Sequence, residues 1–510
     1  MQEATPVTRY GWGIRVYPYV IAASFPLGMW LGNLSEEPTM ADVGLTFALT
    51  LMLVAAGDAL LRRVMRDACG RSLWLALLVV GWFGYGHGFE LLRCWVRMHR
   101  YFAPLWAAAF AAAACGLVLI CRRNLAEPVS HWMRNTSYFL AAGQLICAGA
   151  VTCPLSARLD ESPRQREPTV ALAAGDRSVP RPDIYYIILD GYAREDVLRE
   201  LFGFDNRPFL EALRRRGFYI ATGARSNYAQ TRLSLSSSLS MNYLPPASPG
   251  ATWESYYRRI RCLRRRSRVV ERLRQMGYRY RYVGSESFPA DRSADEELSP
   301  FGAGRTYLRA FLATTVLGLA EKTLRWGEYL QDSVEINDYQ LRNIARSKSR
   351  SSPLYTFAHL RCPHWPYLYN RHGPLPEPIS KEEAGPGDYV EQLRYLNGRV
   401  IELIDAIDRT SGPDAVILLQ ADHGSDMLGM PAHPDKDQIF ERLSIFSAYR
   451  CPPRVRERLY PTITPVNSFR VVFGGLFGDD LPVLVDRSFY SPYEAPLNLV
   501  EVPPESFCGR

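Results

Sequence analysis

The chain has 510 residues, more than one ordinary hydrophobic core accommodates, and this length predicts at least two domains. Its formal net charge is +8, but it has no zinc-finger spacing and no aromatic RNA-binding motif, which excludes the common nucleic-acid-binding modules. The basic residues instead flank apolar runs, which indicates a membrane as the partner.

The first 153 residues consist mainly of Ala, Leu, Val, Gly and aromatic residues. A single apolar run could be a buried core helix. Five successive runs with short loops would need a very large core, however, and each is close to the ~20 residues that a helix needs to cross a bilayer. The predicted membrane spans are 15–34, 42–61, 72–92, 102–121 and 136–153.

The basic residues between these runs predict the orientation, because Arg and Lys gather in cytoplasmic loops. Arginines that predict a cytoplasmic position for their segments are Arg9, Arg15, Arg62, Arg63, Arg66, Arg71, Arg122, Arg123 and Arg134. The first loop, LSEEPTM, has none. We therefore expect residue 154 onward to lie outside the cytoplasm, although the basic loop Arg93–Arg100 argues against this orientation.

Residues 154–181 are rich in Pro, Arg, Asp and Glu, lack periodicity and are predicted to be a linker. From residue 182 to 510 the chain alternates amphipathic helices with short apolar runs. These runs include DIYYIIL at 183–189, PLYTFAHL at 353–360, AVILLQ before Asp422, and LSIFSAYR at 443–450. The alternation predicts an α/β domain with a mostly parallel central sheet and helices on both faces.

Three features of this second half occur together. ILDG ends the first strand, a Thr- and Ser-rich helix start follows about forty residues later, and LLQADHG ends a late strand. The set resembles the alkaline phosphatase and sulfatase superfamily. With five preceding spans, it looks most like the membrane-anchored branch of lipoteichoic acid synthases and phosphoethanolamine or phosphoglycerol transferases. No Cys/Ser-x-Pro/Ala-x-Arg motif lies near Thr231, which disfavours a formylglycine sulfatase.

Several residues at predicted strand ends are candidate metal ligands. Asp190 could be a turn or capping residue, but the resemblance implies a metal ligand, where the transferase branch commonly has Glu. Asp422 and His423 follow an apolar strand, where buried polar groups are costly unless they are paired or bind metal. With Thr231 they form the predicted metal site, and mixed oxygen and nitrogen ligands favour Zn²⁺ or Mn²⁺ over Ca²⁺.

Thr231 lies at a predicted helix N-terminus, where a Thr is usually a capping residue. A helix N-terminus also favours a bound phosphate, and the resemblance implies that Thr231 is the nucleophile of a covalent phospho-enzyme. Ser234 is the alternative nucleophile. We expect Asn227, just upstream, to help hold the phosphoryl oxygens.

Three of the eight histidines follow predicted strand ends: His359, His364 and His433. The resemblance implies that they contact the substrate phosphate or leaving group, or together bind a second metal. His364 and His433 are accordingly predicted to be catalytic with Thr231. Three unrelated histidines are the alternative.

The sequence therefore predicts a metal-dependent phosphoryl-group transferase that moves a phospholipid-derived headgroup to an envelope glycan or lipid. A phosphodiesterase or phosphatase of the same superfamily, and a membrane protein that only binds ligands, are the alternatives. We expect an anchor in a bacterial cytoplasmic membrane, with the catalytic domain facing the periplasm.

Overall fold

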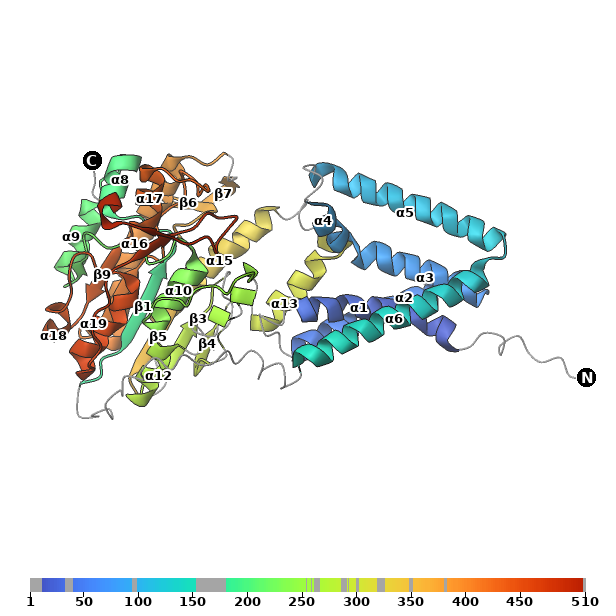
Figure 1. The fold of residues 1–510 in the computed structure, drawn as a ribbon, viewed down its shortest axis with the longest axis horizontal. Helices are drawn as coiled ribbons and strands as arrows, with labels where there is room; N and C mark the ends of the chain where they lie inside the picture. Colours follow the sequence, from blue (N-terminus) through green and yellow to red (C-terminus); the bar gives the residue numbers. More distant parts are fainter. Residues whose placement is uncertain are drawn as a thin grey trace, which may run out of the picture. The chain divides into compact units, whose positions relative to one another are not determined.

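In the computed structural model the described residues fall into two compact units, each treated by itself (Figure 1). One comprises Met1–Glu167 with Phe301–Trp326, and the other Pro168–Pro300 with Gly327–Arg510. The structure describes residues 12–32, 40–93, 99–152, 180–253, 255–257, 259–260, 267–285, 291, 293–299, 302–318, 326–347, 352–379 and 383–507. The predicted division at 153 and 181 stays a prediction, since nearly all of the linker lies outside these ranges.

Within the described residues of the first unit, the secondary-structure elements are helices joined by short turns. Its helices are α1 (Trp12–Gly32), α2 (Met40–Val64), α3 (Ala68–Phe83), α4 (Tyr85–Arg93), α5 (His99–Arg122), α6 (Ala126–Thr152) and α13 (Gly302–Ala313). Each predicted span overlaps one long helix, except that the third is divided between α3 and α4 at Gly84. By length and composition, α2 and the stretch Phe102–Arg122 of α5 can cross a membrane. Residues 94–98 of the basic loop lie outside the described residues.

Large apolar side chains are exposed along α2, α5 and α6. They include Leu45, Leu49, Met52, Leu53, Leu105, Leu119, Phe139, Leu140, Leu145 and Ile146. A helix of a water-soluble protein would bury most of such a surface against a core, whereas lipid tails solvate it without cost. The exposed surface therefore supports membrane anchoring of this unit.

Helix α13 belongs to the first unit and packs against its other helices, although it follows residue 300 in the sequence. Tyr307 and Phe311 are buried in one cluster with Val43 of α2 and Phe83 of α3. The amide of Gly86 also donates a hydrogen bond of 2.8 Å to the carbonyl oxygen of Thr314. This segment was expected to be part of the catalytic half, and its apolar contacts place it with the helices instead.

The second unit is built on a seven-stranded sheet whose central strand is β1 (Ile184–Leu189). The strand order is β2 (Tyr219–Ile220), β9 (Ser447–Arg450), β8 (Val416–Gln420), β1, β5 (Leu354–Leu360), β3 (Arg279–Val283) and β4 (Glu296–Leu298). All neighbours from β8 to β4 are parallel, and β9 is antiparallel to both of its neighbours. The predicted mostly parallel sheet is confirmed. Two small sheets pair β6 (Tyr367–Asn370) with β7 (Gly373–Ile379), and β10 (Ser488–Tyr490) with β11 (Val500–Val502).

Helices cover both faces of this sheet. They are α8 (Glu195–Phe202), α9 (Arg207–Arg215), α10 (Thr231–Ser240), α12 (Arg268–Gln275), α15 (Trp326–Ile344), α16 (Pro386–Ser411), α17 (Lys436–Leu443), α18 (Pro453–Arg456) and α19 (Pro465–Phe477), with a 3₁₀ turn at Pro504–Phe507. Successive residues of a strand point to opposite faces. Accordingly, the hydroxyl of Tyr185 bonds Ser411 of α16, whereas the ring of Tyr186 packs edge-on against Phe469 of α19.

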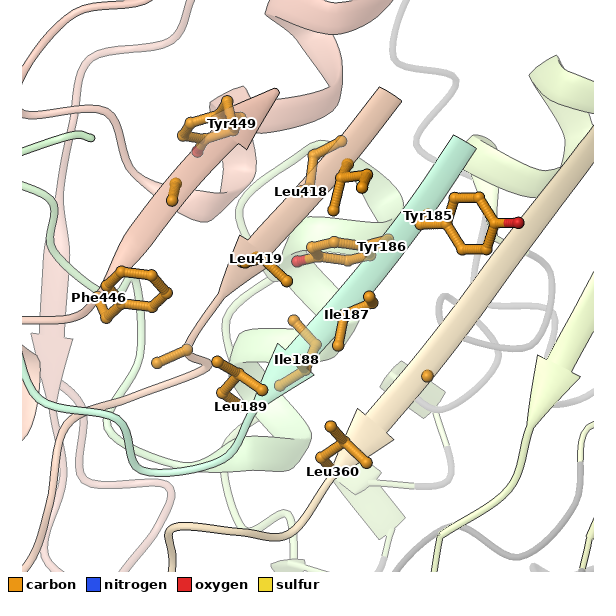
Figure 2. Packing of buried hydrophobic residues seen from close by; sticks show 14 of the residues in the cluster. Tyr185, Tyr186, Ile187, Ile188, Leu189, Leu360, Leu418, Leu419, Phe446 and Tyr449 are labelled. Carbon is orange, nitrogen blue, oxygen red and sulfur yellow. The ribbon is translucent and has the colours of Figure 1, made fainter. Parts of the chain in front are cut away.

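The core lies on both sides of β1, whose six residues are all buried. Figure 2 shows Ile187, Ile188 and Leu189 beside Leu418 and Leu419 of β8. A strand buried on both faces reads as a continuous apolar run, which is the pattern that located β1, β5 and β8 in the sequence. The three strands form a rigid base for the residues that follow their carboxyl ends.

Candidate active site

Three adjacent parallel strands, β8, β1 and β5, bring the predicted ligands to one edge of the sheet. Ile188 of β1 pairs with Gln420 of β8 and with His359 of β5. Asp190 and Asp422 both lie two residues beyond this paired row, so they stand at the same level. Ligands at the carboxyl ends of central strands are typical of open α/β sheets.

The side chains of Asp190, His359 and Asp422 converge, with one potential ligand atom from each lying within 4.8 Å of the others. His359 Nε2 lies 3.4 Å from Asp190 Oδ2. His423 Nε2 lies 3.4 Å from Asp190 Oδ1 and 3.3 Å from Asp422 Oδ2. We refer to Asp190, His359, Asp422 and His423 as the ligand cluster. His359 was predicted to follow a strand and to contact the substrate phosphate or a second metal, but it lies within β5, which places it beside Asp190.

Two carboxylate oxygens of this cluster are buried without a hydrogen-bond partner among the described residues: Asp190 Oδ1 and Asp422 Oδ2. Burial alone would raise the pKa of Asp190, but His364, His359 and His423 hold this pKa well below its usual range. Burying unpaired carboxylates costs several kcal/mol, roughly, unless a cation or a proton neutralises them. These orphan oxygens, together with imidazole nitrogens, fit a divalent metal ion.

The tautomer of His423 suits this interpretation. Its Nδ1–H donates to the carbonyl oxygen of Gly424 at 2.9 Å, which leaves a lone pair on Nε2, the atom that faces both carboxylates. A backbone carbonyl behind the ring is the usual partner of a metal-binding histidine. Burial, and to a lesser extent the charge of Arg442, lower the pKa of His423 and favour this neutral form.

Thr231 joins the cluster from α10. Its Oγ1 lies 2.8 Å from His423 Nε2, and Thr231 is the first residue of the helix, after Gln230. Gln230 occupies the N-cap position and makes no side-chain capping bond, so Thr231, one residue further on, is not the capping residue. The free amides of a helix N-terminus stabilise negative charge, and a hydroxyl at this point can meet a phosphoryl group.

Serine and arginine side chains hold the backbone around Asp422. Ser226 Oγ and Ser234 Oγ both donate to the Asp422 carbonyl oxygen. Arg442 donates to the carbonyl oxygens of Ala229 and Gly424, which joins the two loops on either side of Thr231 and His423. Ser234, the alternative nucleophile, therefore has a structural bond. No pattern in the sequence predicts the role of Arg442, because its partners are backbone atoms.

His364 lies in the loop after β5, next to Asp190. Its amide donates to the Asp190 carbonyl oxygen at 3.0 Å, and its Nδ1–H donates to the Trp365 carbonyl oxygen at 2.7 Å. Its ring centroid is 6.0 Å from that of His423. Gln392 of α16 fixes this loop, since Nε2 donates to the carbonyl oxygens of residues 363, 364 and 366 and Oε1 accepts the amide of residue 368.

Two predicted site residues stand apart from the cluster. Both ends of the Asn227 amide are engaged, since Oδ1 accepts the amide of Val466 and Nδ2 donates to the carbonyl oxygen of Arg487. These bonds give Asn227 a structural role and lend no support to phosphate binding by its side chain. His433 is exposed in the loop before α17. A second metal held by His359, His364 and His433 stays a prediction.

No protein-family model matches the chain, and no curated protein matches it in sequence. Solved structures do match. The C-terminal periplasmic domain of EptC from Escherichia coli has 14% identity and a TM-score of 0.40, and the match covers 64% of this chain and 94% of that one. Another structure of that domain is a complex with Zn, with a TM-score of 0.40, 13% identity and the same coverage.

Two further matches have similar values. The soluble domain of lipooligosaccharide phosphoethanolamine transferase A from Neisseria meningitidis has 12% identity and a TM-score of 0.36, over 60% of this chain and 91% of that one. The phosphonate monoester hydrolase of Agrobacterium radiobacter has 12% identity and a TM-score of 0.37, over 61% and 80%. All are enzymes of the superfamily that the sequence motifs resemble. At these identities and TM-scores, the likeness assigns neither activity nor substrate to this chain.

Proposed function

We propose that this chain is a metal-dependent phosphoryl-group transferase with Thr231 as its nucleophile. The observation that carries the proposal is the position of Thr231 Oγ1, 2.8 Å from His423 Nε2 and beside two buried carboxylates with unpartnered oxygens. A nucleophile at a helix N-terminus next to a cation site is suited to phosphate esters, because phosphoryl transfer depends mainly on positioning and charge neutralisation.

A divalent cation held by the ligand cluster would neutralise phosphoryl charge and lower the pKa of the Thr231 hydroxyl. Mixed oxygen and nitrogen ligands suit Zn²⁺ or Mn²⁺. Because His423 Nε2 would hold the cation, the Thr231 proton leaves toward solvent. Oγ1 then forms a bond to phosphorus, and the bond from phosphorus to the leaving alcohol oxygen breaks.

His364 is the proposed general acid for the leaving alcohol. Its Nδ1–H is committed to the Trp365 carbonyl oxygen, so Nε2 is the atom that can deliver a proton. After the alcohol has left, the same nitrogen can accept the proton of an incoming hydroxyl, which attacks the phosphothreonine and regenerates Thr231. The molecule that attacks the phosphothreonine determines the reaction class. If it is an alcohol the reaction is a group transfer, and if it is water the reaction is a hydrolysis.

The exposed apolar faces of α2, α5 and α6 support a membrane location for this reaction. We infer that the chain is anchored in a bacterial cytoplasmic membrane and acts on its periplasmic side. We infer also that one substrate is a membrane lipid and that the acceptor is an envelope glycan or lipid. A phosphodiesterase or phosphatase with the same site is the alternative.

The full-length chain in detergent provides the test of the site. Thr231→Ala should lose turnover of a phosphodiester by at least about 10³-fold while it keeps its bound metal, because removal of a nucleophile leaves only binding and electrostatics. Ser236→Ala is the matched control, since it removes a buried hydroxyl of the same helix whose bond is to the Arg232 carbonyl oxygen. Full activity of Thr231→Ala, or metal-free wild-type protein after dialysis against Zn²⁺ or Mn²⁺, would overturn the proposal.

A labelled lipid separates transferase from hydrolase. With a donor whose headgroup carries a radiolabel, a transferase deposits the label on an added acceptor, and a hydrolase releases it into solution. Mass spectrometry of a proteolytic digest of the quenched reaction should show the same group on the peptide that contains Thr231. The added mass identifies the transferred group.

A further inference from the structure

The last turn of α17 is bonded to two loops of the candidate active site, one that leads to Thr231 and one that follows the ligand cluster. The amide of Gly424 donates to the carbonyl oxygen of Arg442 at 2.7 Å. The amide of Ser226 donates to the carbonyl oxygen of Leu443 at 2.8 Å. One short segment of helix therefore serves as a common support for both loops.

The side chain of Arg442 joins the same two loops directly. Its Nε donates to the carbonyl oxygen of Ala229 at 2.8 Å, and its Nη1 donates to the carbonyl oxygen of Gly424 at 3.1 Å. Ala229 lies two residues before Thr231, and Gly424 directly follows His423. Because the guanidinium is planar and its donors have a fixed geometry, these bonds restrict the position of one loop relative to the other.

The charge of Arg442 has no counter-ion in the described part of the chain. The residue is only 4% exposed, and none of its described contacts is an ion pair with a carboxylate. The adjacent Glu441 instead accepts from Ser425 Oγ and from the amides of Met427 and Leu428. A buried charge without a counter-ion is costly, so an apolar side chain or a neutral amide would serve the stability of the fold better.

The bond from Arg442 to Gly424 acts on His423. The carbonyl oxygen of Gly424 accepts two hydrogen bonds, one from Arg442 and one of 2.9 Å from His423 Nδ1. The direction of this carbonyl therefore sets the orientation of the imidazole ring, whose Nε2 faces Thr231. Groups that orient a metal-binding histidine from behind in this way strongly affect affinity or activity.

The bond from Arg442 to Ala229 acts on the start of α10. Ala229 is held on both sides, since its amide donates to the carbonyl oxygen of Phe489 at 3.1 Å and its carbonyl oxygen accepts from Arg442. The next residue, Gln230, gives the helix no side-chain capping bond. The backbone that places Thr231 therefore depends on these two bonds.

We propose that Arg442 is a positioning residue of the phosphoryl transfer, which holds Thr231 and His423 in one mutual geometry through the carbonyl groups of Ala229 and Gly424. The inference rests on the proposed function and deepens it. Because Arg442 acts on the nucleophile and not on the substrate, its loss should lower the rate of attack more than the affinity for substrate. A displacement of about 1 Å between reacting groups lowers a rate by about 10²-fold.

The first-turnover burst of nitrophenolate from a p-nitrophenyl phosphodiester measures the attack by Thr231. Arg442→Gln should lower the rate constant of the burst at saturating substrate by about 10²-fold, with little change in the substrate concentration that gives half of it. The shorter amide reaches one of the two carbonyl groups, and it also removes the uncompensated charge, which offsets part of the lost bonding. Arg442→Lys should be similarly slow, since an ammonium keeps the charge but lacks the planar fork.

Arg450→Gln is the matched control. Arg450 is also buried and donates to a backbone carbonyl, that of Ala415, but Ala415 precedes β8, at the end of the strand opposite to the ligand cluster. Its charge is compensated by Asp408. Arg450→Gln should lower the melting temperature and leave the burst rate constant unchanged. Equal burst losses in the Arg442 and Arg450 variants, or no loss in Arg442→Gln, would overturn the proposal.

Hydrogen exchange of the metal-free chain in detergent separates this proposal from the proposed function. Arg442→Gln should speed exchange at residues 224–235 and 421–428 and leave that of α16 unchanged, whereas a uniform increase would assign Arg442 to the fold alone. Local loosening, in a chain whose wild type shows no turnover that depends on Thr231, supports the bridge and contradicts the catalytic proposal. Turnover that depends on Thr231, with wild-type exchange and burst rates in Arg442→Gln, does the reverse.

Discussion

Asp190 and Asp422 follow the ends of adjacent parallel strands, each two residues past the paired row of Ile188 and Gln420, and their unpartnered oxygens face the same histidine, His423. The sheet therefore brings two buried carboxyl groups side by side. Histidines hold the pKa of Asp190 below its usual range, and a cation would neutralise both groups further, so metal affinity and stability are coupled at these two residues.

Asp190→Asn should separate stability from metal binding. In a chelator the variant should unfold at a lower temperature than the wild type, because the histidines that hold the pKa of Asp190 low stabilise its carboxylate and would not stabilise a neutral amide in the same way. With added Zn²⁺ the difference should widen, because the variant has lost a metal ligand. Asp414→Asn, an exposed control, should change neither melting temperature. Equal effects of the chelator on wild type and Asp190→Asn would contradict a cation site.

His364→Ala tests proton donation to the leaving group. Turnover of a phosphodiester with an alkyl alcohol should fall by about 10²-fold or more, because the alkoxide then leaves without a proton. The first-turnover burst of nitrophenolate from a p-nitrophenyl ester should fall far less, since nitrophenolate needs no protonation and the burst precedes the step in which His364 accepts a proton. His372→Ala, a loop histidine with an exposed side chain, is the control. Equal losses on both esters would show that His364 positions the substrate instead.

Gly86→Ala tests the assignment of α13 to the helical unit. A Cβ on Gly86 would lie 2.6 Å from the Cα and carbonyl oxygen of Thr314, and backbone atoms cannot move aside cheaply. We expect faster hydrogen exchange and easier proteolysis at residues 302–318. Gly143→Ala meets no described atom within 4 Å and should stabilise its helix by about 0.5–1 kcal/mol. An unchanged exchange rate in Gly86→Ala would contradict this packing.

Glu441 should give stability a pH dependence. Burial raises its pKa, although Ser425 and the amides of Leu428 and Met427 donate to its carboxylate and oppose this effect. A raised folded-state pKa means stability that is present below the unfolded value of about 4.5 and is lost as pH rises through the folded value. Relative to Glu441→Gln, the wild-type melting temperature should therefore fall over that pH range. A constant difference between the two would contradict the raised pKa.

The ion pair between Arg272 and Asp479 is fully buried, with side chains 1% and 0% exposed. Asp479→Ala should destabilise the chain by about 3–5 kcal/mol, because it leaves a guanidinium buried with its charge uncompensated. The exposed pair of Arg207 and Asp205 is the control, and Arg207→Ala should change the free energy of unfolding little, because water screens its charge. Chemical denaturation measures both, and similar losses would show that water reaches Arg272.

Sequence by itself determined the central strands, the long apolar helices and several polar residues at the strand ends. Continuous apolar runs identified β1, β5 and β8, since a strand buried on both faces has no polar side, and Asp190, Asp422 and His423 were found where those runs stop. Apolar composition likewise located the long helices of the first unit. These signals are local, so they can be read along the chain.

Only the tertiary structure decided which strands are neighbours and therefore which residues at their ends lie close together. The order β8, β1, β5 places His359 beside Asp190, although 169 positions of sequence separate them, and no local pattern encodes strand order. The same holds for α13, whose apolar face packs with helices of the first unit. It holds also for Gln340, whose polar side chain lines a pocket only in the folded chain. Pairing and packing between distant segments create these sites, because burial, and with it the cost of an unpartnered charge or amide, exists only in the folded chain.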